Sequence, residues 1–291
     1  MRARTALCGV TAAVLLTTAA ATAQAPAPEG NFGGGALVAP PRGHFGPGNA
    51  VIGLRALPGR KLEIEASIRA KCAGGEIAAA TTVAEDGSFS AEGTERTEPE
   101  RGVSVTTKFK LAGTFSSATA ADGTLTATIT RRTEGRTSTC KSGSVKFGAR
   151  RPGGDIGTPG AIPGARYYGT TAQRGVGPRR PIVIRISTDG RVILRALFGE
   201  SVRCSDDTRA TGIEAPRTNA PIDSEGRVKD VEKSKASSGN TLVTFDDRFN
   251  GQFGSKGAKG TLSLSDVTLD KTTGRILQSC RSGVVKWSAA P

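Results

Sequence analysis

The chain is poor in the residues that build most familiar active sites. Its 291 residues include one histidine, one methionine and one tryptophan, and aromatic residues make up only 4%. A mechanism based on histidine would have to use His44, whose Pro- and Gly-rich surroundings are more typical of a surface residue. There is no pair of histidines, no Cys-x-x-Cys motif, and no phosphate or dinucleotide loop. We therefore expect no metal site and no cofactor, and we favour a non-catalytic protein.

One local pattern resembles a catalytic motif. Ser138 and Lys141 have the Ser-x-x-Lys spacing of penicillin-recognising serine enzymes, which place both residues on one face of a helix. Here the segment is expected to be extended, and residues three apart in a strand point to opposite faces. The match is interpreted as accidental.

Paired acidic residues are the other candidates for chemistry. Asp206-Asp207 and Asp246-Asp247 could contribute oxygen ligands to calcium, but the loop pattern of a known calcium site is missing. We interpret them as solvated loop carboxylates. Because any two acids can converge in a fold, a glycosidase-like pair stays open as an alternative.

The N-terminus has the pattern of an export signal. Arg2 and Arg4 precede an apolar stretch over residues 6–21, and Ala21-Thr22-Ala23 supplies the small residues of a cleavage site. We predict a signal peptide over residues 1–23, with cleavage after Ala25 as the alternative. The apolar stretch is short for a membrane span, and no second run of membrane length follows it. The protein is expected to be secreted, with no transmembrane segment.

The chain repeats itself. Residues 140–149 (CKSGSVKFGA) match residues 280–289 (CRSGVVKWSA) at six of ten positions. Upstream, Gly-x-Phe occurs at residues 113–115 and 251–253, and Gly-Thr-Leu at residues 123–125 and 260–262. Because these matches keep one order along the chain, they indicate a duplicated unit.

These repeated motifs also carry a resemblance. The ending Cys-Lys/Arg-Ser-Gly-x-Val-Lys-Phe/Trp, preceded by Gly-x-Phe and Gly-Thr-Leu, resembles repeats in uncharacterised secreted proteins of high-GC, actinobacterial-type bacteria. The resemblance covers residues 36–291. It implies export and a β fold, and it implies no activity.

Four cysteines remain once Cys8 is removed with the signal. An even number in an exported chain predicts a disulfide framework. Cys72 and Cys140 hold corresponding places to Cys204 and Cys280 in the two repeats. We therefore predict one bridge per repeat, although loop length alone leaves cross-repeat pairing open.

Hydrophobic residues alternate with polar ones in both repeats. Leu62, Ile64, Ala66 and Ile68 alternate with polar residues, as in a half-buried strand. Asp-Gly pairs at residues 86–87, 122–123 and 189–190 mark turns. One short helix is conceivable over residues 76–84. The fold class we predict is all-β, with two tandem antiparallel β-sandwich or barrel-like repeats.

Glycine and proline mark the expected boundaries. Residues 24–35 are predicted to form a flexible Pro/Gly-rich arm, followed by the first repeat over residues 36–150. Residues 151–165 read as a Gly/Pro linker, and the second repeat covers residues 166–291. A linker of this composition predicts semi-independent repeats.

Positive charge is the remaining functional signal. The chain has 40 Lys and Arg residues and 26 Asp and Glu residues, which gives a formal charge of +14. Such a surface suits an anionic cell-envelope polymer or simply maintains solubility. Scarce aromatics argue against stacked single-stranded nucleic acid and against carbohydrate binding by ring stacking, so nucleic acid is not an expected partner. The candidate anion-contacting residues are Lys108, Lys110, Arg131, Arg132, Arg150, Arg151, Arg179, Arg180, Lys233 and Lys235.

The leading hypothesis is a secreted binding or structural module held at the cell envelope by basic patches. A secreted hydrolase with an unrecognised carboxylate site between the repeats is the first alternative. A protein-binding or inhibitor module acting on an extracellular protein is the second. Paired acids in a shared cleft would favour the hydrolase.

Overall fold

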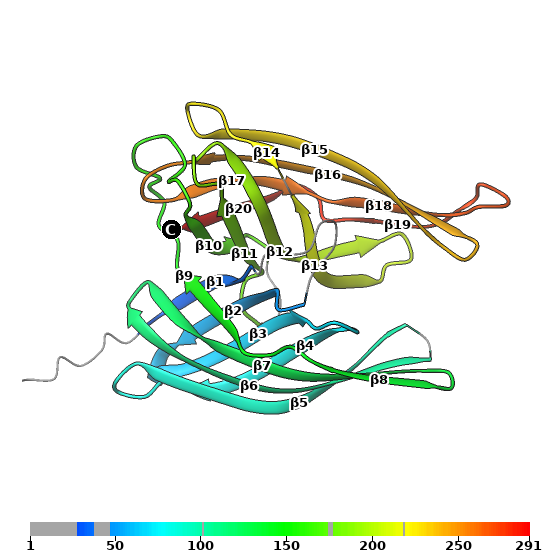
Figure 1. Ribbon diagram of the computed structural model, residues 1–291, viewed down its shortest axis with the longest axis horizontal. Coiled ribbons are helices and arrows are strands. Elements are labelled where there is room, and N and C mark those ends of the chain that lie inside the picture. Colours follow the sequence, from blue (N-terminus) through cyan, green and yellow to red (C-terminus); the bar gives the residue numbers. More distant parts are fainter. Residues whose placement is uncertain (1–27, 38–46, 101, 174–176, 218) are drawn as a thin grey trace, which may run out of the picture.

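A computed structural model describes residues 28–37, 47–100, 102–173, 177–217 and 219–291 (Figure 1). The predicted signal peptide, Cys8 and His44 lie outside these residues. The described chain is almost entirely β-structure, with one turn of 3-10 helix at Pro58–Arg60. This confirms the predicted all-β fold class.

Strands β1 to β9 form unit 1, and strands β10 to β20 form unit 2. In unit 1 they are β1 (Gly30–Ala36), β2 (Ala50–Leu57), β3 (Lys61–Arg69), β4 (Gly74–Thr82), β5 (Ser88–Glu100), β6 (Val103–Ser117), β7 (Ala120–Thr133), β8 (Arg136–Lys141) and β9 (Val145–Arg150). In unit 2 they are β10 (Arg166–Thr171), β11 (Pro181–Ile186), β12 (Val192–Cys204), β13 (Arg209–Arg217), β14 (Ala220–Pro221), β15 (Arg227–Ser238), β16 (Thr241–Phe253), β17 (Ala258–Ser263), β18 (Ser265–Asp270), β19 (Ile276–Arg281) and β20 (Val285–Ala290).

The two units share one strand order. Unit 1 runs β4-β3-β2-β1-β9-β7-β6-β5, and the same path in unit 2 runs β13-β12-β11-β10-β20-β17-β16-β15. Strands β17 and β18 together take the place of β7, and β19 takes the place of β8. In unit 2, β19 also pairs with β12, so the sheet curls into a nearly closed barrel.

The predicted disulfides are both present. Cys72 is bonded to Cys140, and Cys204 is bonded to Cys280, one bridge in each unit. Cys72 lies in the turn after β3 and Cys204 is the last residue of β12, and each is bonded to a cysteine of the short strand β8 or β19. The repeat therefore gave the correct pairing.

Each curved sheet encloses a core in which aliphatic side chains surround a cluster of aromatic rings. Leu62, Ile64, Ala66 and Ile68 are at most 4% exposed, as their alternation predicts. Trp287 lies in the core of unit 2 and stacks on Phe249, with ring centroids 5.0 Å apart.

Two segments differ from their expected structure. Residues 76–84, where a short helix was conceivable, lie mostly in β4, because nine-residue pairing with β3 outweighs the helix preference of three alanines. The arm expected over residues 24–35 contains β1, whose Phe32 is fully buried. Unit 1 therefore begins at Gly30 and not at residue 36.

The segment over residues 151–165 is ordered against unit 2, although its composition predicts a flexible linker. The Ser255 amide donates to the Thr158 carbonyl, and Pro159 forms a bridge with Gly254. Lys256 Nζ lies 3.2 Å from Asp155 Oδ2. These contacts hold the connection against the turn between β16 and β17.

The two units pack face to face, so they are not semi-independent. The outer faces of β1 and β2 meet those of β10 to β12, and Figure 1 shows these strands opposed. Val51, Val183 and Leu197 form a small buried cluster between them. Gly33 comes so close to Gly169 that a Cβ on Gly33 would lie 1.9 Å from the Gly169 carbonyl oxygen. This close approach explains why position 33 requires glycine.

Candidate functional site

A shallow groove of about 670 Å³ lies on the outer face of β5 to β8 in unit 1. Alternation of the strand residues sends Phe109 and Ala127 into the core and leaves their neighbours on the outer face. We call this surface the Thr/Lys groove, and its outward side chains are Glu92, Thr94, Lys108, Lys110, Thr126, Thr128 and Lys141.

Strand register arranges these side chains in two rows across the groove. The first row runs Thr94, Lys108, Thr128 and Lys141, so hydroxyl and ammonium groups alternate over four strands. The second runs Glu92, Lys110 and Thr126. Neighbouring strands are about 4.8 Å apart, so adjacent members of a row can contact one ligand.

The groove carries three lysines against one glutamate. Lys110 Nζ lies 3.0 Å from Glu92 Oε2, and both side chains are more than 70% exposed, so this ion pair is weak. Lys108 and Lys141 are exposed, and neither forms an ion pair within the described part of the chain. The groove therefore presents net positive charge on a rigid sheet.

The corresponding surface of unit 2 is also basic, but its charges are arranged differently. The equivalent row runs Lys233, Asp246, Ser265 and Arg281. Asp246 takes the place of Lys108 and lies 3.5 Å from both Lys233 and Arg248. Lys235 lies in the same small groove of about 260 Å³. The duplication thus kept the scaffold and a basic surface in both units, whereas the alternation of hydroxyl and ammonium groups occurs in unit 1.

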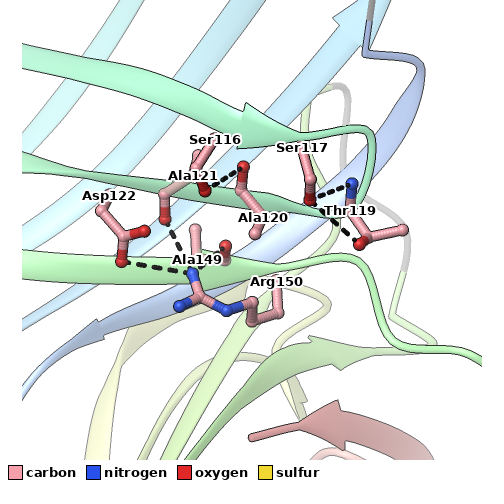
Figure 2. A network of polar contacts seen from close by, with 8 residues as sticks. All are labelled: Ser116, Ser117, Thr119, Ala120, Ala121, Asp122, Ala149 and Arg150. Atoms are coloured by element: carbon pink, nitrogen blue, oxygen red, sulfur yellow. Dashed lines mark hydrogen bonds and ion pairs between the residues drawn. The ribbon is translucent and has the colours of Figure 1, made fainter. Parts of the chain in front are cut away.

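Arg150, predicted to contact anions, is part of a local network (Figure 2). Its Nη1 donates to the Ala121 and Ala149 carbonyls and lies 3.2 Å from Asp122 Oδ1. Its guanidinium also lies over the Tyr168 ring of unit 2, 5.4 Å from the centroid. Figure 2 shows this network beside the β6–β7 turn, where Ser117 and Thr119 hydrogen-bond each other.

The remaining predicted arginines fall into two groups. Arg151 lies over the Phe32 ring, and Arg180 pairs with Glu65 across the units at 3.0 Å. Arg131, Arg132 and Arg179 have exposed side chains, the first two on the far half of β7. The predicted basic clusters are therefore dispersed, and the structure brings only Lys108 and Lys110 together with a third lysine.

A second groove, of about 290 Å³, lies where the two units meet. Glu65, Ser67 and Glu76 of unit 1 face Arg180 of unit 2 there, and Glu95 completes the wall. Desolvation raises the pKa of Glu76, and the neighbouring charge of Glu65 adds to this rise. The hydrogen bond from Ser67 and the charge of Arg180 oppose it. Two acids thus share a cleft between the units, each with a partner: Arg180 for Glu65 and Ser67 for Glu76.

Replacing Glu76 by glutamine is expected to stabilise the fold more at pH 7 than at pH 4. The raised pKa means that ionised Glu76 costs stability in the folded state, and this cost disappears as pH falls through the folded pKa. Denaturant unfolding of wild type and Glu76→Gln at both pH values measures the difference. Ser67→Ala removes a contact that lowers the pKa, so it should make the wild-type pH dependence steeper. An equal effect of Glu76→Gln at both pH values would contradict this account.

Unit 2 carries acids on its inner face where unit 1 is apolar. Register places Asp230, Glu232, Asp247 and Asp266 at the positions of Ala91, Gly93, Phe109 and Ile129. Asp247 is only 5% exposed, and burial raises the pKa of Asp266. Within the described residues, no group of three or more His, Cys, Asp or Glu side chains is placed to hold a metal ion.

The other patterns noted in the sequence have structural explanations. Asp206 accepts hydrogen bonds from the Thr208 amide and hydroxyl, which lower its pKa, and Asp207 pairs with Arg203. Ser138 and Lys141 lie on opposite faces of β8, which agrees with the accidental Ser-x-x-Lys match.

Sequence reasoning missed Lys141, the groove threonines and the inward acids of unit 2. Alternating threonines at positions 124, 126, 128 and 130 were a signal for the groove, because all four must share one face of a strand. For the acids, the alignment of Asp247 with Phe109 already shows a buried position that turned acidic.

Comparison with known proteins adds little to this geometry. No protein-family model matches the chain, and no match is found among curated proteins. A solved protein of unknown function, from the DUF3598 family of Nostoc punctiforme, is 10% identical. The match covers 90% of this chain and 96% of that one with a TM-score of 0.20, which supports no inference. Among the described residues there is no helix with the length and apolar character that a membrane crossing needs.

Proposed function

We propose that the protein is an exported, non-catalytic module that binds an anionic polymer of the cell envelope through the Thr/Lys groove. The observation that carries the proposal is the row Thr94–Lys108–Thr128–Lys141. It places two lysines that form no ion pair with the described residues on adjacent parts of one rigid sheet. The predicted export signal and the two disulfides support an extracytoplasmic location.

The proposal predicts that Lys108→Gln with Lys141→Gln strongly reduces retention on isolated cell envelope at low salt. Wild-type retention should fall steeply as salt rises, because exposed charges are screened within about 10 Å at 0.1 M salt. The matched control is Lys233→Gln with Arg281→Gln, at the equivalent places of unit 2. Co-sedimentation measures both. Equal losses in the two double variants would mean that only net charge matters.

A second candidate is hydrolysis in the groove between the units. It is favoured by one observation, the raised pKa of Glu76 beside the ion-paired Glu65. Incubating the protein with an acidic polysaccharide and measuring chain length separates the two functions. Shortening that is lost in Glu76→Gln would support the hydrolase, and unchanged chain length supports the binding module.

A further inference from the structure

We propose that the Thr/Lys groove is specific for an acidic polysaccharide, a chain that carries both anionic groups and free hydroxyl groups. This inference rests on the proposed binding function and names its ligand class. It depends on which hydrogen-bonding groups the groove has left to offer.

The lysines of the groove favour hydrogen-bond acceptors on the ligand. Lys108 and Lys141 flank Thr128 on the two neighbouring strands, each about 5 Å away across the sheet. An ammonium group has three donors and no acceptor, so these positions favour carboxylate, sulfate or phosphate oxygens. A neutral polysaccharide would leave both ammonium groups without a counter-ion.

Thr126, by contrast, favours a hydrogen-bond donor on the ligand. Its hydroxyl donates to the Lys110 carbonyl oxygen in a long contact of 3.4 Å, which directs the proton toward the sheet. What Thr126 then presents to the groove is a pair of acceptor sites. A carboxylate or a phosphate diester has no donor for them, whereas the hydroxyl groups of a sugar do.

The groove also lacks the usual means of binding neutral sugars. The one aromatic residue among those that line it, Phe109, is 5% exposed and faces the core. Ring stacking is therefore not offered, and affinity has to come from charge and hydrogen bonds. A groove with ammonium donors beside hydroxyl acceptors fits a ligand that is both acidic and hydroxylated.

The arrangement is particular to unit 1. In unit 2 the position of Lys108 holds Asp246, and that of Thr94 holds Lys233, so the alternation of hydroxyl and ammonium groups is lost. The alternating row that suits an acidic and hydroxylated chain therefore exists on one of the two equivalent faces.

The test uses the full mature chain with two probes, polygalacturonate and inorganic polyphosphate, and measures the affinity for each. We expect Thr126→Val to weaken polygalacturonate binding about fivefold, as for one lost hydrogen bond, and to leave polyphosphate binding unchanged. Thr126→Ser keeps the hydroxyl and should retain wild-type affinity. Thr124→Val, two residues along the same strand and outside the groove, is the matched control. Valine and threonine both suit strands, so the fold should persist.

Three results would overturn the inference, and they differ in what else they overturn. If Thr126→Val weakens both probes equally or neither, the specificity for hydroxyl groups is wrong and the proposed anion binding stands. If wild type binds polyphosphate and not polygalacturonate, the ligand class is wrong. If wild type binds neither probe, the proposed function fails with it.

Discussion

Replacing Cys72 and Cys140 together by serine is expected to lower the free energy of unfolding by about 4 kcal/mol. The bridge closes a loop with a sequence separation of 68 residues, and the chain-entropy model gives about this value for such a loop. The effect should extend to local structure, because β8 pairs only with β7 among the described strands. Chemical denaturation measures the stability, and hydrogen exchange at β8 measures the local opening.

The second disulfide provides the comparison. Cys204→Ser with Cys280→Ser removes a bridge of similar span, but β19 remains paired with both β18 and β12. We expect a similar loss of stability with much less loss of protection in β19 than in β8. A loss below about 1 kcal/mol in unit 1, or equal exchange in the two short strands, would contradict this account.

Gly33→Ala is expected to have the second largest effect, at the upper end of the roughly 1–3 kcal/mol typical of overpacking. The new Cβ would lie 1.9 Å from the Gly169 carbonyl oxygen and 2.7 Å from Thr170 Cγ2. Since β1 is paired on both sides, with β2 and β9, it cannot move without breaking its own sheet. The strain should therefore be relieved by separation of the units.

Denaturant unfolding and the radius of gyration in solution measure this outcome. The control is Gly153→Ala, because a Cβ there meets no atom within 4 Å and should change neither quantity. If Gly33→Ala keeps wild-type stability and dimensions, the close packing of the units is wrong.

The sequence was most informative where structure depends on local pattern. Alternation at residues 62–68 predicted a strand and its buried face, because period two is fixed by strand geometry. The repeat predicted the disulfides, because the same fold must bring corresponding cysteines together. Both inferences needed no knowledge of distant contacts.

Inference from the sequence failed where a contact between distant residues determines the structure. The sequence GNFGGGA over Gly30–Ala36 has almost no β-propensity and reads as a flexible arm. Gly33 is required by the approach of unit 2, and Gly34 and Gly35 by close contact with neighbouring strands of unit 1, which no local pattern reveals. The linker was misread for the same reason, since its order comes from contacts with the turn between β16 and β17.

The candidate site was predicted in part. Lys108 and Lys110 are neighbours on one strand, so their clustering is visible in the sequence, whereas Lys141 joins them only through pairing of β7 with β8. Arg150 and Arg180 were expected to contact anions, but Asp122 and Glu65 are their partners. A sequence shows which residues are charged, but it does not show which residues form ion pairs with them.

The most direct test of the binding account is the affinity for polygalacturonate measured over a range of salt concentrations. Binding through ammonium groups releases counterions, so the logarithm of the affinity should fall linearly with the logarithm of salt, as for nucleic acid. The account predicts a slope that is shallower by about one to two in Lys108→Gln with Lys141→Gln. The control Lys233→Gln with Arg281→Gln should keep the wild-type slope. Equal slopes in all three proteins would contradict the assignment of binding to the Thr/Lys groove.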